Sequence, residues 1–326
     1  MNPSTFLTSA DHKLDTIPVA LEERALTLPA VDRLWRYAGA YAFAALRGIV
    51  GSHRLRLDAM HSYGTAVHIS ARLARRWRAL FDVPSRAAAV VPLASHQSAS
   101  TLLQARLFTD LGLNLRRLRH LQHRTVHHAG VDVCARARQY QLSCAVHRVL
   151  RMGKSAALVQ VQTQVQSVDG ELWSVVEDGF LIEGLPEDDL QALPSDSSVL
   201  REVLGLRRRL PRLSTTSGDA LVSEMQVPSD MGRAYGRISG DLSPIHSSRL
   251  GAWLFGLKGP FLQGLALRNL VVRHLAELQV PIDRLSLTFA APAAVGQTLL
   301  LVVLGSEVEV HDHGGRLVAF GSSLAH

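Results

Sequence analysis

The strongest constraint on the fold is the stretch AALVQVQTQVQ, residues 156–166. Its valines and threonine, at every second position from Val159 to Val165, point to one face, and the intervening glutamines point to the other. A period of two is typical of a half-buried strand in an antiparallel sheet. VDGE (168–171) then provides a hairpin turn, and 172–182 return as a second strand. With an apolar helix expected over 98–113, these residues predict an antiparallel sheet preceded by a helix.

The second half of the chain repeats this order of elements. No long stretch is identical, so the repeat is one of architecture. A helix followed by long strands, twice, indicates an α+β fold in which each of two antiparallel sheets wraps around a central helix. The expected second-half elements are a helix over 264–278 and strands over 284–291, 298–304, 306–310 and 317–325, with 119–133 as the first-half counterpart of 284–291.

The length of 326 residues is enough for two domains, and a shift in composition separates them. Pro186, Pro194, the polar run PSDSS and an arginine cluster are typical of a linker. The predicted organisation is a helical N-terminal region over 1–84, a first folded half over 85–182, a linker over 183–225 and a second folded half over 226–326.

The chain carries a formal net charge of +7, which favours anionic partners without choosing among them. Residues 72–81 form a basic amphipathic segment with Leu73, Trp77 and Leu80 on one face, which we interpret as a helix with a solvated basic face. No recognition-helix or zinc-finger pattern accompanies the arginines, so the sequence does not favour nucleic acid binding.

Two cysteines, Cys134 and Cys144, show no Cys-x-x-Cys spacing and indicate a reducing compartment. The N-terminus lacks the pattern of a secretory signal. Residues 37–51 are apolar but shorter than the roughly 20 residues that span a bilayer, and they contain Arg47. We interpret them as a buried helix, with membrane-surface binding as the alternative, and expect a cytoplasmic protein without a transmembrane segment.

Residues 238–246, ISGDLSPIH, place the carboxylate of Asp241 five positions before the imidazole of His246. Ser243 and Pro244 are a good N-cap and first-turn pair, since a serine oxygen can bond an orphan backbone N–H and proline has none. Taken alone, this stretch fits either a helix start or an acid–base pair, because an imidazole changes protonation near neutral pH.

A longer pattern surrounds this pair over residues 235–270. It is similar to the pattern of the MaoC-like hydratases and dehydratases, a family of hotdog-fold enzymes that act on acyl thioesters. The positions that carry the resemblance are Tyr235, Ser239, Gly240, Asp241, Pro244, Ile245, His246, Ala252, Gly256, Leu257, Pro260, Phe261, Leu262, Gln263 and Gly264.

The resemblance implies a double hotdog, with a degenerate first hotdog over 85–182 and the active site in the second over 226–326. It implies a hydro-lyase that reversibly hydrates trans-2-enoyl thioesters or dehydrates (3R)-hydroxyacyl thioesters, in fatty-acid or polyketide-type metabolism. The acyl group would be carried on coenzyme A or an acyl carrier protein. No cofactor is implied, and a homodimer is compatible with the family.

In the family, the aspartate and histidine work together as acid and base, and Asp241 and His246 occupy their positions. The backbone N–H of Gly264, at the start of the central helix, would stabilise the enolate-like thioester oxygen. The remaining substrate-binding positions are Ser243, Gln263, Pro260 and Phe261. Ser243 and Gln263 replace the family's usual asparagine and histidine, which leaves a non-catalytic thioester-binding protein or subunit as the alternative.

The run HLQHRTVHH contains His120, His123, His127 and His128. They alternate unevenly on an expected strand, and the run itself contains no carboxylate or cysteine partner, so we expect no metal site. The arginines around this run could contact a phosphate of coenzyme A or an acidic carrier, or could form a solvated edge.

Overall fold

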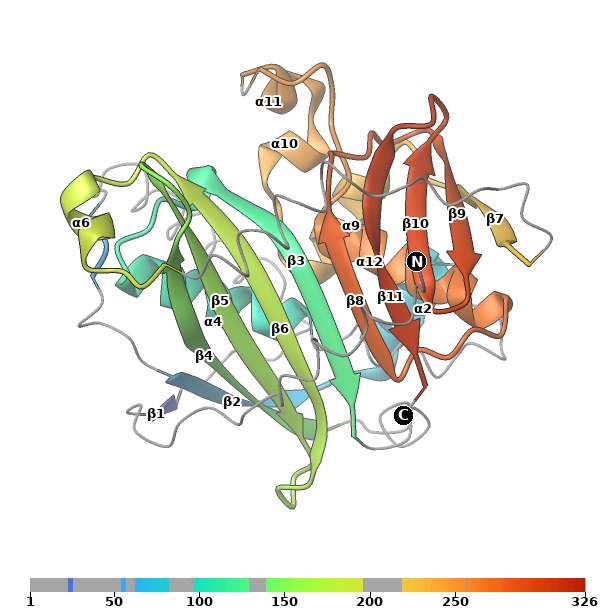
Figure 1. Ribbon diagram of the computed structural model, residues 1–326. Helices are drawn as coiled ribbons and strands as arrows, with labels where there is room; N and C mark the ends of the chain where they lie inside the picture. Colours follow the sequence, from blue (N-terminus) through green and yellow to red (C-terminus); the bar gives the residue numbers. More distant parts are fainter. Residues whose placement is uncertain are drawn as a thin grey trace, which may run out of the picture.

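The computed structural model describes residues 23–25, 54–56, 62–81, 97–128, 139–195, 219–254 and 256–325. Among these residues, one sheet of 11 strands runs in the order β1-β2-β4-β5-β6-β3-β8-β11-β10-β9-β7 (Figure 1). Neighbouring strands are antiparallel, except for the parallel pair β1 and β2. The strands are β1 (Glu23–Ala25), β2 (Ser62–His68), β3 (Leu118–His127), β4 (Gln139–Arg151), β5 (Ala156–Gln166), β6 (Leu172–Glu183), β7 (Leu221–Gln226), β8 (Arg284–Phe289), β9 (Thr298–Leu304), β10 (Glu307–Asp312) and β11 (Leu317–Leu324).

The sheet order shows that the chain consists of two equivalent halves. The first half runs β2-β4-β5-β6-β3, and the second runs β7-β9-β10-β11-β8. The halves meet where β3 pairs with β8, in a register that sets Gln122 opposite Thr288 and Val126 opposite Arg284. Each half therefore contributes its own curved sheet, and backbone hydrogen bonds join the two into one.

One long helix belongs to each half. α4 (Gln97–Asp110) lies against the first-half strands and α12 (Gly264–Glu277) against the second-half strands, on the same side of the continuous sheet (Figure 1). The remaining helices are α2 (Ala71–Phe81), η4 (Leu115–Arg117), α6 (Glu187–Gln191), α9 (Met231–Ser239), α10 (Pro244–Ser247) and α11 (Arg249–Leu254). None of the described helices is long and apolar enough to cross a membrane.

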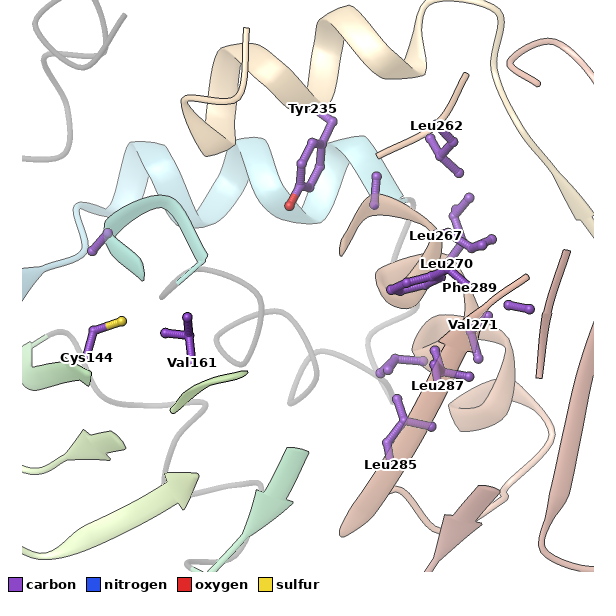
Figure 2. Close-up of a cluster of buried hydrophobic side chains, with 14 of the residues drawn as sticks. Cys144, Val161, Tyr235, Leu262, Leu267, Leu270, Val271, Leu285, Leu287 and Phe289 are labelled. Atoms are coloured by element: carbon purple, nitrogen blue, oxygen red, sulfur yellow. The ribbon is translucent and has the colours of Figure 1, made fainter. Parts of the chain in front are cut away.

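The core forms where α12 packs on the strands of its own half. Figure 2 shows Leu267, Leu270 and Val271 of α12 on the side of the helix that faces β8, near Leu285 and Leu287. These five side chains are at most 3% exposed. Burial of such aliphatic side chains stabilises a fold by roughly 1.5–3 kcal/mol each. The face of α12 that points into the sheet is therefore fixed, and with it the position of its first residue, Gly264.

α2 extends this core with aromatic side chains. Trp77 stacks on Phe81 with ring centroids 5.8 Å apart, and Tyr235 from α9 makes T-shaped contacts with both rings. Arg72, Arg75 and Arg78 of α2 are exposed, so the interpretation of a solvated basic face is confirmed.

The α+β class is confirmed, and so are the strand predictions for 156–166 and 172–182. In β5, the expected glutamine face forms a row in which Gln164 donates to Gln162 and Gln166 donates to Gln164.

The sequence predicts a mainly helical region over 1–84, whereas 62–68 form the strand β2 and pair with β4. Tyr63, Thr65 and Val67 are buried at alternate positions, and the strand lies between β1 and β4 in the sheet. Likewise, the predicted linker includes 221–225, but these residues belong to β7, which pairs with β9. The helix expected over 37–51, Cys134 and much of the expected linker lie outside the described residues.

Candidate active site

The segment that carries Asp241 and His246 runs from the end of α9 into α10. The backbone N–H of Asp241 donates to Ser239 Oγ, at 3.2 Å. Asp241 Oδ1 accepts from the backbone N–H of Ser243, also at 3.2 Å. An aspartate that bonds its own backbone two residues on forms a local turn. One carboxylate oxygen is held in this way, which leaves Oδ2 available.

His246 is oriented by a carbonyl from a different segment. Its Nδ1 lies 2.8 Å from the backbone oxygen of Phe261, and because a carbonyl can only accept, Nδ1 carries the proton. The Phe261 ring contacts the imidazole edge-on, with centroids 4.5 Å apart. In the neutral ring, Nε2 therefore presents a lone pair.

That lone pair faces the aspartate. His246 Nε2 lies 3.8 Å from Asp241 Oδ2, and the side chains are 11% and 21% exposed. This distance is too long for a direct hydrogen bond but allows both atoms to contact one water molecule. The arrangement can hold a water and move a proton to or from it.

Ser243 and Pro244 occupy the expected positions at the start of α10, with Ser243 as the N-cap residue and proline in the first turn. The expectation that the serine hydroxyl caps the helix is wrong, since Ser243 makes no side-chain cap bond. The turn is held instead by the backbone N–H of His246, which donates to the Ser243 carbonyl at 3.1 Å.

Helix α9 lies directly beneath this segment. A Cβ added at Gly232 would collide with the carbonyl oxygen of His246. Only glycine lets the two backbones approach so closely. The short distance between His246 and α9 therefore depends on the absence of a side chain at Gly232.

Gln263 is the N-cap residue of α12 and is only 3% exposed. Its Nε2 donates to the carbonyl of Gly232 at 2.9 Å and lies 3.4 Å from the carbonyl of Asp241. Its Oε1 is buried without a hydrogen-bond partner among the described residues. The side chain thus connects the start of α12 to α9 and to the backbone of Asp241.

The segment before α12 is fixed by the second half's own loop. Leu262 N–H donates to the Ala293 carbonyl at 2.7 Å, and Val295 N–H to the Pro260 carbonyl at 3.3 Å. These bonds place the Phe261 carbonyl at His246. Of the expected site residues, Asp241, Ser243, His246, Pro260, Phe261, Gln263 and Gly264 all belong to this connected region.

Gly264 is the first residue of α12. A Cβ at this position would lie 3.0 Å from Nδ1 of His120 and 3.0 Å from Cε2 of Phe289. His120 comes from β3, in the first half of the chain. The start of α12 is therefore contacted by a side chain from the other half, which the sequence analysis did not place at the site.

His120 belongs to a buried polar cluster centred on Asp178 of β6. Asp178 Oδ1 accepts from His120 Nε2 at 2.9 Å and from His123 Nδ1 at 2.7 Å. Asp178 Oδ2 accepts from Gln104 Nε2 of α4 at 2.7 Å. The histidine-rich run contains no carboxylate of its own, but sheet pairing sets Asp178 opposite His123.

A bulge in β3 makes the cluster possible. His120 pairs with Phe180 and Gln122 pairs with Gly179, so Leu121 is an extra residue in the strand. Residues three apart normally point to opposite faces of a strand, and one extra residue restores the same face. His120 and His123 consequently point to the side that carries Asp178.

The charge state of the cluster follows from its burial and from the contacts between its members. Burial alone would raise the pKa of Asp178, but His123 and His120 hold it well below its usual range, so Asp178 is ionised. Burial lowers the pKa of His123. The neutral His123 donates from Nδ1 to Asp178, and its Nε2 accepts from the hydroxyl of Thr125 at 2.8 Å.

No known family profile matches the chain, and no curated protein matches it. Several solved structures are similar to the chain. A MaoC-like dehydratase from Phytophthora Capsici shares 15% identity at a TM-score of 0.62, over 83% of this chain and 98% of that one. HtdX of Mycobacterium tuberculosis shares 16% identity at a TM-score of 0.58, over 81% of this chain and 100% of that one.

The peroxisomal multifunctional enzyme type 2 from Drosophila melanogaster shares 17% identity at a TM-score of 0.54, over 81% of this chain. The matched region spans 48% of that longer enzyme. Together with the two equivalent halves, these similarities define the fold. The chain is a double hotdog of the kind found in MaoC-like dehydratases.

Proposed function

We propose that the protein is a MaoC-like hydro-lyase that reversibly hydrates trans-2-enoyl thioesters or dehydrates (3R)-hydroxyacyl thioesters of coenzyme A or an acyl carrier protein. The observation that carries the proposal is the pairing of His246 Nε2 with Asp241 Oδ2 at 3.8 Å, with His246 Nδ1 fixed by Phe261. The fold supports the same class of reaction.

The reaction needs a base that takes a proton from water and an acid that delivers one to the α-carbon. Asp241 and His246 can share one water and exchange its proton, which meets both needs in either direction. As water adds to the β-carbon, negative charge develops on the thioester oxygen. The backbone N–H of Gly264, in the first turn of α12, is a donor suited to that oxygen.

The experiment follows the absorbance of the conjugated double bond as purified protein is given crotonyl and longer enoyl thioesters. We expect turnover by the wild type and a loss of roughly 100- to 10,000-fold in kcat for Asp241→Asn and for His246→Ala. Asp230→Asn serves as the matched control, because Asp230 precedes α9 and makes no side-chain cap bond. Turnover that survives both site variants contradicts the assignment.

The alternative of a thioester-binding protein without turnover is favoured by Gln263, whose buried amide cannot titrate where the family has a histidine. It predicts that acyl thioesters raise the Tm while no hydration occurs. Hydration by the isolated chain excludes it.

A further inference from the structure

An imidazole from the first half of the chain lies against the start of α12. The ring of His120 stacks on Phe180, with centroids 4.7 Å apart and planes 19° apart, and lies 5.0 Å from the ring of Phe289. A Cβ at Gly264 would be 3.0 Å from His120 Nδ1. The aromatic rings hold the imidazole, and they direct Nδ1 toward the helix N-terminus where an oxyanion would be stabilised.

Only one nitrogen of this ring is used by the protein. His120 Nε2 donates to the ionised Asp178 at 2.9 Å, whereas Nδ1 has no hydrogen-bond partner in the described part of the chain. The His120 side chain remains 15% exposed, while Asp178 is 4% exposed. An imidazole held by a buried carboxylate on one side presents its second nitrogen to a reacting group, and the carboxylate stabilises the protonated ring.

We propose that His120 is a catalytic residue of the thioester site, donating a hydrogen bond from protonated Nδ1 to the thioester oxygen beside the N–H of Gly264, and that Asp178 is its positioning residue. This inference rests on the proposed function. It gives the first hotdog, which lacks its own Asp-x-x-Pro-x-His motif, a role in the active site of the second. It also places a titratable side chain at the start of α12, where the side chain of Gln263 cannot titrate.

Three side chains of the cluster, His120, His123 and Asp178, also lie close enough together to hold a metal ion. Their hydrogen bonds argue against it. His123 Nε2 is bonded to Thr125, and Asp178 Oδ2 is bonded to Gln104. The buried guanidinium of Arg268 on α12 already places a positive charge near Asp178 and His123. A divalent cation would replace both histidine–aspartate bonds and add repulsion from Arg268.

Two variants of His120 separate a catalytic role from a structural one. In His120→Asn, the amide nitrogen can reach the position of Nδ1 but cannot reach Asp178. In His120→Gln, the amide nitrogen can reach the position of Nε2 but leaves no donor at the position of Nδ1.

We expect His120→Gln to lower kcat by roughly 100-fold or more with little change in KM, as for loss of an oxyanion donor. His120→Asn should retain clearly more activity, and Asp178→Asn should lower kcat at unchanged KM. Equal losses in the two His120 variants, or full activity in His120→Gln, overturn the proposal.

A second measurement does not depend on turnover. Butyryl-coenzyme A labelled with ¹³C at the carbonyl is bound to each protein, and the infrared band of the carbonyl is recorded. We expect a shift to lower frequency in the wild type that is reduced in His120→Gln and largely kept in His120→Asn. An identical band in the wild type and in His120→Gln overturns the role of His120 and leaves the proposed function intact. Failure of the wild type to bind the thioester overturns both.

Discussion

At the scale of single residues, Gln263 shows how one buried amide links two segments of the candidate site. Its buried amide bonds two backbone carbonyls, those of Gly232 and Asp241, and so connects α12 to the segment that carries the candidate acid–base pair. The polar residue at this position therefore has a positioning role that does not require titration.

We expect Gln263→Leu to lower the free energy of unfolding by about 1–3 kcal/mol, because the buried hydrogen bond from Gln263 Nε2 to the Gly232 carbonyl would be lost. Urea unfolding measures the change. Gln191→Leu is the matched control, since Gln191 is exposed at the end of α6. If both variants unfold at the wild-type urea concentration, the amide bonds of Gln263 contribute nothing to stability.

The Asp178 cluster makes stability depend on pH. Because burial lowers the pKa of His123 below 6.5, the unfolded chain binds a proton there before the folded protein does. The free energy of unfolding should therefore fall as the pH drops below 6.5, by at most about 1.4 kcal/mol per pH unit for one proton. Asp178, whose pKa lies below its usual 3.8, stabilises the fold above that pH and loses its contribution as the pH falls further.

Urea unfolding of the wild type and of His123→Asn, between about pH 7 and about pH 5, tests this dependence. The asparagine can still donate to Asp178 but cannot titrate, so we expect a smaller slope in the variant. If the free energy of unfolding changes with pH equally in both proteins, the acid sensitivity comes from other groups, such as His274, whose pKa is also lowered by burial.

At the scale of elements, the close contact between α9 and α10 determines the position of His246 relative to α9. We expect Gly232→Ala to lower kcat by roughly 100-fold, since a displacement of about 1 Å at a catalytic group has that effect. Helix propensity alone predicts that Gly232→Ala raises the stability of the fold, because alanine stabilises a helix by about 1 kcal/mol relative to glycine. Kinetics and thermal unfolding of the variant separate the two. Gly259→Ala is the control, as a Cβ there meets nothing within 4 Å. Equal kcat in both variants would show that the close approach of Gly232 to His246 is not needed for activity.

The sequence predicts those elements whose side chains alternate strongly, such as β5, and those that carry a spaced motif, such as the Asp241–His246 segment. It misses β2, although Tyr63, Thr65 and Val67 alternate there, because the strand is short and follows and precedes segments with a helical pattern. The His120–Asp178 bond joins residues 58 positions apart and depends on an extra residue in β3. Neither the register nor the bulge has a signature in the sequence, so the cluster could not be predicted.

At the scale of the whole molecule, the two halves are equivalent in topology but not in chemistry. α12 begins with Gly264, whose missing side chain leaves its N-terminus open to His120 and Phe289. α4 begins with Gln97, whose side chain turns to the other half. The first residue of α4 thus supplies contacts to α12 and α9.

These contacts should couple the halves during unfolding. Gln97 Nε2 donates to Asn269 Oδ1 of α12 at 3.1 Å, and Gln97 Oε1 accepts from Asn269 Nδ2 and from the hydroxyl of Tyr235 of α9, each at 3.0 Å. All three side chains are at most 4% exposed, so a partner that loses these bonds stays buried without them.

A double-mutant cycle of Gln97→Leu and Asn269→Leu measures the coupling by urea unfolding. We expect each single variant to destabilise the fold by about 1–3 kcal/mol, because the other buried amide loses its two hydrogen bonds to the replaced side chain. The double variant should be more stable than the sum predicts, by about 0.5–3 kcal/mol. Gln104→Leu combined with Asn269→Leu is the control pair, since Gln104 bonds Asp178 and not Asn269. An additive result for Gln97 and Asn269 would mean that the two central helices are stabilised independently, with the β3–β8 pairing as the main connection between the halves.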